Sequence, residues 1–157
     1  MLGVCYIRKD AFAEAVSAYS ALAAASPSVA VLNNLGVAEV RQGDYALAVQ
    51  HLLEADRLSR SDPDVALNLA ILRYLQGNME AAESILERIV AGHPYRPLVL
   101  YLLSRVLDAR GQAEKSAAVL AESKRIGAET EKLQAEDPRR WCRVFDAWDQ
   151  RPRAAGF

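Results

Sequence analysis

Several features that define whole classes of protein are scarce in this sequence. Of its 157 residues, 19 are Lys or Arg and 20 are Asp or Glu, so the formal net charge is only -1. Such a balance builds no single-sign field to attract nucleic acid or an anionic membrane surface. No apolar run is long enough for membrane insertion. Cys5 and Cys142 lie near opposite ends of the chain, so instead of a disulfide framework we expect reduced thiols that fill apolar space.

Residues that carry catalysis or bind metals are scarce as well. His51 and His93 are the only histidines, and neither has a carboxylate or thiol at the spacing of a ligand set. The sequence contains no HExxH motif, P-loop, nucleophile elbow or glycine-rich dinucleotide turn. Cys142 lies beside Arg143, which could lower the pKa of its thiol, but no histidine accompanies it as a base. We therefore expect no enzyme, no cofactor and no metal, and a function that lies on a surface.

What the sequence does contain is a repeat. Its composition, 52% hydrophobic and 25% charged, is that of a globular domain with a substantial core. Gly43, Gly77 and Gly111 follow one another at intervals of 34 residues, and Asn34-Leu35-Gly36 returns as Asn68-Leu69-Ala70 at the same interval. A fixed period of this length is typical of architectures in which one supersecondary unit stacks on the next.

The period divides the chain into three full rows, at residues 29–62, 63–96 and 97–130. Each row has two segments whose apolar residues recur at spacings of three and four, which indicates two helices. The glycine between them permits the positive φ that ends a helix. Each row is therefore predicted to be a helix–turn–helix hairpin.

Boundary signals and small residues support the hairpins. Asp44 and Asn78 follow the turn glycines and can cap the next helix. Pro63 and Pro97 open their rows at a first-turn position, where no amide hydrogen is needed. Small residues share two slots where the paired helices must approach, and a Leu at either slot would strain the packing by roughly 1–3 kcal/mol. These slots hold Gly36, Ala70 and Ser104 in the first helices, and Ala48, Ala82 and Ser116 in the second.

The row at 29–62 also carries a recognisable set of residues. It comprises Asn34-Leu35-Gly36, Gly43-Asp44-Tyr45, Ala48, Leu52 and Ala55, and a proline follows at the row end. This set resembles the tetratricopeptide repeat family. Leu32 and Glu39 depart from the family's aromatic and Tyr, and Ile89 and Ser123 from its Ala. The resemblance implies an all-α, right-handed superhelical solenoid of antiparallel helix pairs.

The two ends of the chain depart from the rows. Residues 1–28 match a repeat that lacks the first part of its first helix, so we expect a truncated first repeat and a polypeptide that begins inside a longer array. Residues 131–150 are expected to form a C-terminal helical cap, followed by a tail at 151–157. Within that cap, Asp137-Pro138 is a helix-start signal. An aromatic stripe at helical spacing follows, formed by Trp141, Phe145 and Trp148.

The resemblance also implies which residues face the inside of the superhelix. Their middle part is apolar, which usually marks a surface that becomes covered. The basic and Asn pattern with which some family members grip a terminal carboxylate is absent, so an extended apolar peptide or an amphipathic helix fits better. The expected partner-binding groove consists of Asn33, Val37, Val40, Arg41, Leu67, Ile71, Tyr74, Leu98, Tyr101 and Arg105.

The aromatic stripe has three conceivable placements. It can cap the row at 97–130 by packing on Leu120, which is the expected placement. It can instead occupy the groove, in cis or from a neighbouring molecule, or stand exposed as a partner-binding helix. These possibilities make Trp141, Phe145 and Trp148 a candidate self-docking or partner helix.

The sequence thus predicts a non-catalytic protein–protein interaction module whose partner is a protein or peptide. One alternative is a structural module that forms homo-oligomers through the truncated N-terminal repeat. Another is a regulatory fragment of a larger multidomain protein. If residue 1 is the native start, the absence of a signal sequence favours the cytoplasm.

Overall fold

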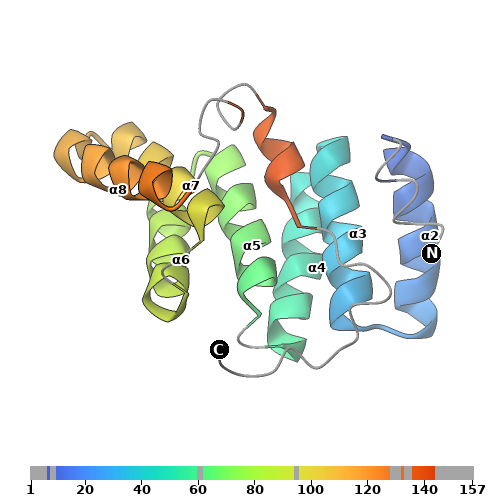
Figure 1. Cartoon of the computed structure of the whole chain (residues 1–157). Coiled ribbons are helices and arrows are strands. Elements are labelled where there is room, and N and C mark those ends of the chain that lie inside the picture. The colour runs from blue at the N-terminus through green and yellow to red at the C-terminus, as the bar shows by residue number, and fades with distance from the viewer. Residues whose placement is uncertain are drawn as a thin grey trace.

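The computed structural model describes residues 7, 10–59, 62–93, 96–127, 132 and 136–143, and it contains only helices and connections over these residues. The helices are α2 (Phe12–Ala25), α3 (Val29–Gln42), α4 (Tyr45–Leu58), α5 (Pro63–Leu75), α6 (Met79–Gly92), α7 (Pro97–Ala109), α8 (Ala113–Arg125) and the 3-10 helix η1 (Pro138–Trp141). Figure 1 shows the α-helices following one another in chain order, whereas η1 lies beside α3 and α5.

The helices pack as successive hairpins. α3 packs on α4, α5 on α6 and α7 on α8, and the hairpins are joined by contacts of α4 with α5 and of α6 with α7. One large cluster of buried apolar side chains runs from Val37 in α3 to Leu107 in α7, and a smaller one joins α2 to α3 around Tyr19 and Leu35. The predicted all-α solenoid of helix pairs is confirmed.

The predicted turn chemistry holds, with one exception. Gly43, Gly77 and Gly111 have φ values of 97°, 76° and 73°, the left-handed region that glycine enters without strain. Asn78 caps α6 by accepting a hydrogen bond from the backbone N–H of Ala81 at 3.2 Å. Asp44 was expected to cap α4 in the same way, but its side chain makes no capping hydrogen bond. The two residues have similar backbone angles, so the backbone does not explain the difference.

Close approach within the first full hairpin explains its glycine. A Cβ added to Gly36 would lie 2.6 Å from Cγ of Leu52 and 3.4 Å from the carbonyl oxygen of Ala48. Leu52 is fully buried and cannot swing away. Helices α3 and α4 therefore meet at a distance that only glycine permits at this slot.

The C-terminal segment departs from the predicted continuous helix. Asp137 accepts a hydrogen bond from the backbone N–H of Arg139 and begins a helix as expected, but η1 is a 3-10 helix that ends at Trp141. Cys142 has φ -58° and ψ 135°, which is extended backbone. Side chains of α3 and α5 hold the main chain of Arg143, and this requires the segment to leave the helix. Phe145 and Trp148 lie outside the described residues.

Candidate functional site

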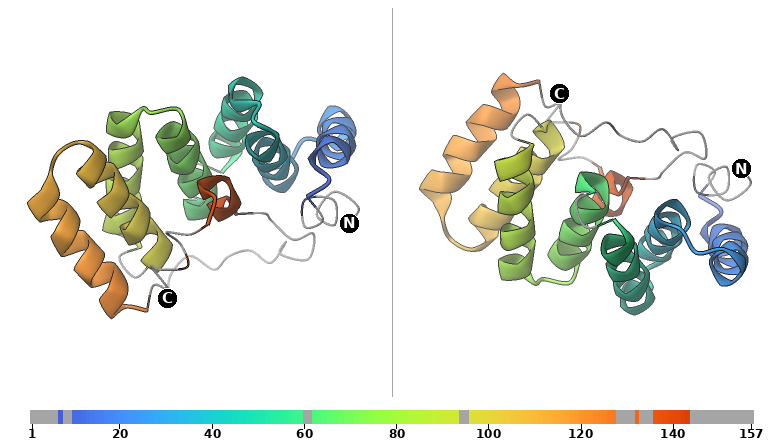
Figure 2. Two further views of the ribbon diagram at one scale, coloured as in Figure 1. Left: turned by 90° about the horizontal axis from the view of Figure 1, so that it is seen from above. Right: turned by 90° about the horizontal axis from the view of Figure 1, so that it is seen from below.

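The described part of the C-terminal segment lies on the first helices of the hairpins. η1 contacts α5 and α3, and Figure 2 shows it beside these two helices in both views. We call the face formed by α3, α5 and α7 the inner wall, and residues 136–143 the docked segment. We expected the segment to cap the last hairpin on Leu120; the described part lies on the inner wall instead, because its aromatic and main-chain partners are there.

Trp141 is the apolar anchor of the docked segment. Only 4% of its surface is exposed. Its ring stacks on Tyr74 of α5 with centroids 6.5 Å apart, and meets Tyr101 of α7 edge-on at 5.6 Å. Aromatic pairs of this geometry contribute about 0.5–1.5 kcal/mol each beyond the burial of their area. The two tyrosines thus form an open box that a single large aromatic side chain fills.

Two asparagines hold the main chain of the docked segment. The amide nitrogens of Asn33 and Asn68 both donate to the carbonyl oxygen of Arg143, each at 2.9 Å. The backbone N–H of Arg143 donates to Oδ1 of Asn68 at 2.6 Å. Asn68 also donates to Oδ1 of Asn33 at 2.7 Å, which fixes the orientation of both side chains. Asn68 therefore binds the N–H and the C=O of one residue, much as a neighbouring strand would.

The asparagine network continues into the first helices of the chain. Asn33 donates to Oδ1 of Asn34 at 3.2 Å, and Asn34 donates to the hydroxyl of Tyr19 on α2 at 3.0 Å. Asn33, Asn34 and Asn68 are all buried. Buried polar groups that satisfy one another in this way form a rigid template. The asparagines are therefore held in fixed orientations around the main chain of Arg143.

A second polar contact lies toward the start of the docked segment. Arg41 donates to the carbonyl oxygen of Arg140 at 3.1 Å, and the guanidinium of Arg140 pairs with Asp10 at 2.9 Å. Burial lowers the pKa of Arg41. Both members of the Arg140–Asp10 pair are about half exposed, so this pair contributes little to stability.

Cys142 is a buried, free thiol whose ionisation is disfavoured by its surroundings. Burial raises its pKa to about 12, although nearby Arg41 acts in the opposite direction. The Arg that the sequence suggested as an activating neighbour, Arg143, donates its backbone N–H to Asn68 instead. Because the thiolate is the reactive form, Cys142 is inert while the segment stays docked.

Contacts of the docked segment leave some polar groups unmatched. Among the described residues, Nε1 of Trp141 and Nε of Arg41 are buried and have no hydrogen-bond partner. The Tyr101 hydroxyl also lacks a partner of good geometry, although Arg105 lies next to it. A buried polar group left unsatisfied costs about 1–3 kcal/mol. The docked segment is thus packed against the inner wall without satisfying every buried polar group there.

A hollow of about 450 Å³ adjoins the aromatic box. Tyr101, which contacts Trp141, also forms part of its lining, together with Arg105 and Asp108 of α7 and Ala117 and Leu120 of α8. None of the described residues of the docked segment lines it. The part of the inner wall on α7 therefore retains room beside the docked segment.

The predicted groove residues fall into two groups. Val37, Val40, Leu67, Ile71 and Tyr101 are buried and share one apolar cluster with Trp141 and Cys142. Asn33 and Arg41 bind the docked segment through hydrogen bonds, Tyr74 stacks on Trp141, Leu98 is half-buried, and Arg105 is exposed.

Sequence reasoning missed Asn68, the residue with the most contacts to the docked main chain. It occupies the slot after the expected inner-wall position, and in the sequence it is visible only as part of the repeating Asn-Leu pair. The signal was available: an Asn at the same slot in two rows, Asn34 and Asn68, is unusual for a buried helix face.

A hydrogen-bonded pair with a buried carboxyl group lies behind the inner wall. Glu39 of α3, in the slot of the family's Tyr, is 2% exposed, and its Oε2 lies 2.8 Å from Nδ1 of His51 on α4. Burial raises the pKa of Glu39, and the hydrogen bond with His51 opposes this effect. His51 is thus a hydrogen-bond partner of a buried carboxyl group from the neighbouring helix.

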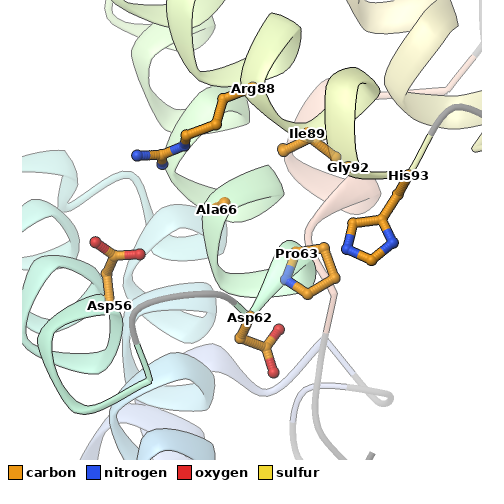
Figure 3. Close-up of a pocket in the computed structure, with 8 residues that line it drawn as sticks. All are labelled: Asp56, Asp62, Pro63, Ala66, Arg88, Ile89, Gly92 and His93. Carbon is orange, nitrogen blue, oxygen red and sulfur yellow. The ribbon is translucent and has the colours of Figure 1, made fainter. Parts of the chain in front are cut away.

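A further hollow, of about 230 Å³, lies between α4, α5 and α6 (Figure 3). Asp56, Asp62, Arg88 and His93 are among its lining residues. Asp62 is engaged as the cap of α5, since it accepts hydrogen bonds from the backbone N–H groups of the next helix. Among the described residues, no group of three or more potential ligands is placed to hold a metal ion. No described helix combines the length and apolarity needed to cross a membrane.

Comparisons with solved structures give a consistent fold. MamA of AMB-1 is 19% identical, with a TM-score of 0.68 over 87% of this chain and 76% of that one. YrrB is 19% identical, with a TM-score of 0.74 over 84% and 70%, and another MamA structure is 23% identical, with a TM-score of 0.73 over 81% and 75%. At these identities the likeness shows the fold alone.

Comparison by sequence gives the family. No curated protein matches the chain. Two family models, both described as tetratricopeptide repeat, match residues 1–64 and 39–94, which together span more than half of the sequence. With the 34-residue period and the stacked hairpins, these matches establish that the chain belongs to the tetratricopeptide repeat family.

Proposed function

We propose that this protein is a non-catalytic interaction module that binds an extended peptide segment of another protein on its inner wall. Tetratricopeptide repeats form scaffolds for protein interactions, and their stacked hairpins offer long binding surfaces. The observation that carries the proposal is the hold of Asn33 and Asn68 on the main chain of Arg143. Side chains that satisfy both polar groups of one residue suit an extended peptide.

Three further features support a peptide ligand. The aromatic box of Tyr74 and Tyr101 provides an apolar anchor site. The hollow beside Tyr101 leaves space for a ligand longer than the docked segment. YrrB, which has the same fold, is described as a protein with an unusual peptide-binding site. An amphipathic helix is less suitable, because its backbone groups are already hydrogen-bonded within the helix and have nothing to offer the asparagines.

Site-specific photo-crosslinking with the full-length chain tests the proposal. A benzophenone amino acid is placed at Arg105, which is exposed on the inner wall, or at Leu53, which is 43% exposed on α4. Neither position is buried, so both variants should fold. We expect a protein partner to crosslink at Arg105 and not at Leu53, and the crosslink to disappear when Tyr74→Glu is added. Equal crosslinking at both positions, or a crosslink indifferent to Tyr74→Glu, would contradict the proposal.

A further inference from the structure

The docked segment has the properties of a bound ligand. It contacts the inner wall through one aromatic anchor, Trp141, and through the main chain of two residues, Arg140 and Arg143. Residues 128–135 join it to the last hairpin, so it occupies the wall as a tethered element. Residues 136–143 do not continue the repeat pattern, although Trp141 and Cys142 join the apolar cluster of the hairpins.

Main-chain recognition also defines the spacing of the ligand. Asn68 holds the peptide unit of Arg143, and Trp141, two residues earlier, fills the box of Tyr74 and Tyr101. Trp141 is the last residue of η1 and Cys142 has extended backbone angles, so a single residue separates the anchor from the clamped residue. The hydrogen bonds that hold Arg143 use its main chain and leave the side chains of Cys142 and Arg143 out.

We propose that residues 136–143 are an intramolecular ligand that blocks the inner wall, and that the partner is an extended peptide with a tryptophan two residues before the unit held by Asn68. This inference rests on the proposed function, because it names the partner of the same surface and its regulation. The partner binds by displacing the docked segment and placing its own tryptophan between Tyr74 and Tyr101.

The docked segment is suited to displacement. Its ion pair with Asp10 is half exposed, and the indole N–H of Trp141 has no acceptor among the described residues. A competing peptide that also carries a hydrogen-bond acceptor for its own indole N–H makes a contact that the docked segment lacks. The Nε of Arg41 likewise has no described partner, which leaves a second position for a carbonyl or carboxylate of the competitor.

The strength of the block follows from the tether. A ligand joined covalently to the chain that carries its site has an effective concentration on the order of 1 mM. If the free peptide binds with a Kd on the order of 10–100 µM, the docked state exceeds the open state by roughly 10- to 100-fold. An added peptide then binds the intact chain roughly 10- to 100-fold more weakly than a chain whose own segment cannot dock.

The test uses the full-length chain with Cys5→Ser, so that Cys142 is its single thiol. The probe is a fluorescein-labelled peptide of residues 136–143 with Cys142→Ser, and its affinity is measured by anisotropy. We expect this peptide to bind the variant that also carries Trp141→Ala about 10-fold or more tightly than the chain that retains Trp141. A control peptide with Trp141→Ala should bind neither protein.

Reactivity of Cys142 gives a second readout that needs no variant of the segment. The thiol is buried while the segment is docked, so its reaction with a disulfide reagent reports undocking. An excess of the unlabelled peptide should accelerate this reaction at least severalfold, and the control peptide should not. The rate without peptide should stay constant on dilution, since the block is intramolecular.

Several results would overturn the inference. Equal affinity of the peptide for both proteins would mean that the segment blocks nothing, and no binding to either would mean that the tryptophan register is wrong. Loss of Cys142 protection on dilution would assign the wall to a second copy of the chain. Failure of the proposed function would give a different result. In that case the peptide would bind as expected, but a protein partner would not crosslink to the inner wall.

Discussion

Replacing Gly36 with alanine should destabilise the protein, because α3 and α4 approach too closely for a side chain. The new Cβ would lie 2.6 Å from Cγ of Leu52, which is the branch point of a fully buried side chain. Overpacking of this kind costs about 1–3 kcal/mol. Alanine is also the better helix former, which returns up to about 1 kcal/mol. The expected net loss of unfolding free energy is therefore up to about 2 kcal/mol.

Gly92 provides a matched control. It lies at the exposed end of α6, and a Cβ added there would meet no atom within 4 Å. Gly92→Ala should therefore stabilise the protein by about 0.4–1 kcal/mol. The two variants share the same chemical change, so the difference between them, about 1–3 kcal/mol, isolates the contact with Leu52. For a chain of this size that difference corresponds to roughly 2–12 °C in Tm.

Urea unfolding followed by circular dichroism measures both variants, and a double-mutant cycle tests the cause. In a Leu52→Ala background the obstructing atoms are gone, so Gly36→Ala should become neutral or mildly stabilising. If Gly36→Ala is as stable as Gly92→Ala, the close approach of α3 and α4 is refuted. If the loss persists in the Leu52→Ala background, the contact with Leu52 is not its source.

Three further expectations follow from the described contacts. Arg143→Pro removes the N–H that Asn68 accepts, at a cost of about 1–3 kcal/mol, and should speed labelling of Cys142 roughly 5- to 150-fold, whereas Arg143→Ala keeps the N–H and should not. Glu39→Gln should raise the urea midpoint at pH 7. The folded-state pKa of Glu39 lies above the unfolded value of 4.5, so the stability it contributes is complete below pH 4.5 and is lost as pH rises through the folded pKa. The advantage of Glu39→Gln should accordingly vanish as pH is lowered to 4.5, and an advantage that grew in acid would contradict the assignment. Asp10→Asn should change neither the melting temperature nor Cys142 labelling measurably, because its ion pair with Arg140 is half exposed.

The hairpins were predictable because their signals are local. Gly43 and Gly77 set the turns, Pro63 and Pro97 begin helices, and the 34-residue period states which segments are equivalent. Each of these depends on a residue and its near neighbours in sequence. The element order and most helix boundaries follow from such signals.

The docked segment was harder to predict, because its contacts join residues far apart in sequence. Asn68 and Arg143 are 75 residues apart, and no sequence pattern near either residue predicts that they are in contact. The spacing of Trp141 from Phe145 and Trp148 favoured a continuous helix, but tertiary contacts to the main chain of Arg143 outweighed that local preference. The aromatic stripe and the apolar inner wall each indicated an uncovered surface, and the sequence left their pairing open.

Recognition through a peptide unit has a consequence for how partners of this surface evolve. Because Asn33 and Asn68 hold the backbone of Arg143 and leave its side chain unread, that position can drift through nearly every amino acid without loss of the contact. Proline is the exception, since it has no hydrogen to donate. Peptides that bind the inner wall in this way would therefore have an aromatic residue in common and would lack proline two positions after it. A pattern of two positions is too sparse for sequence searches to detect.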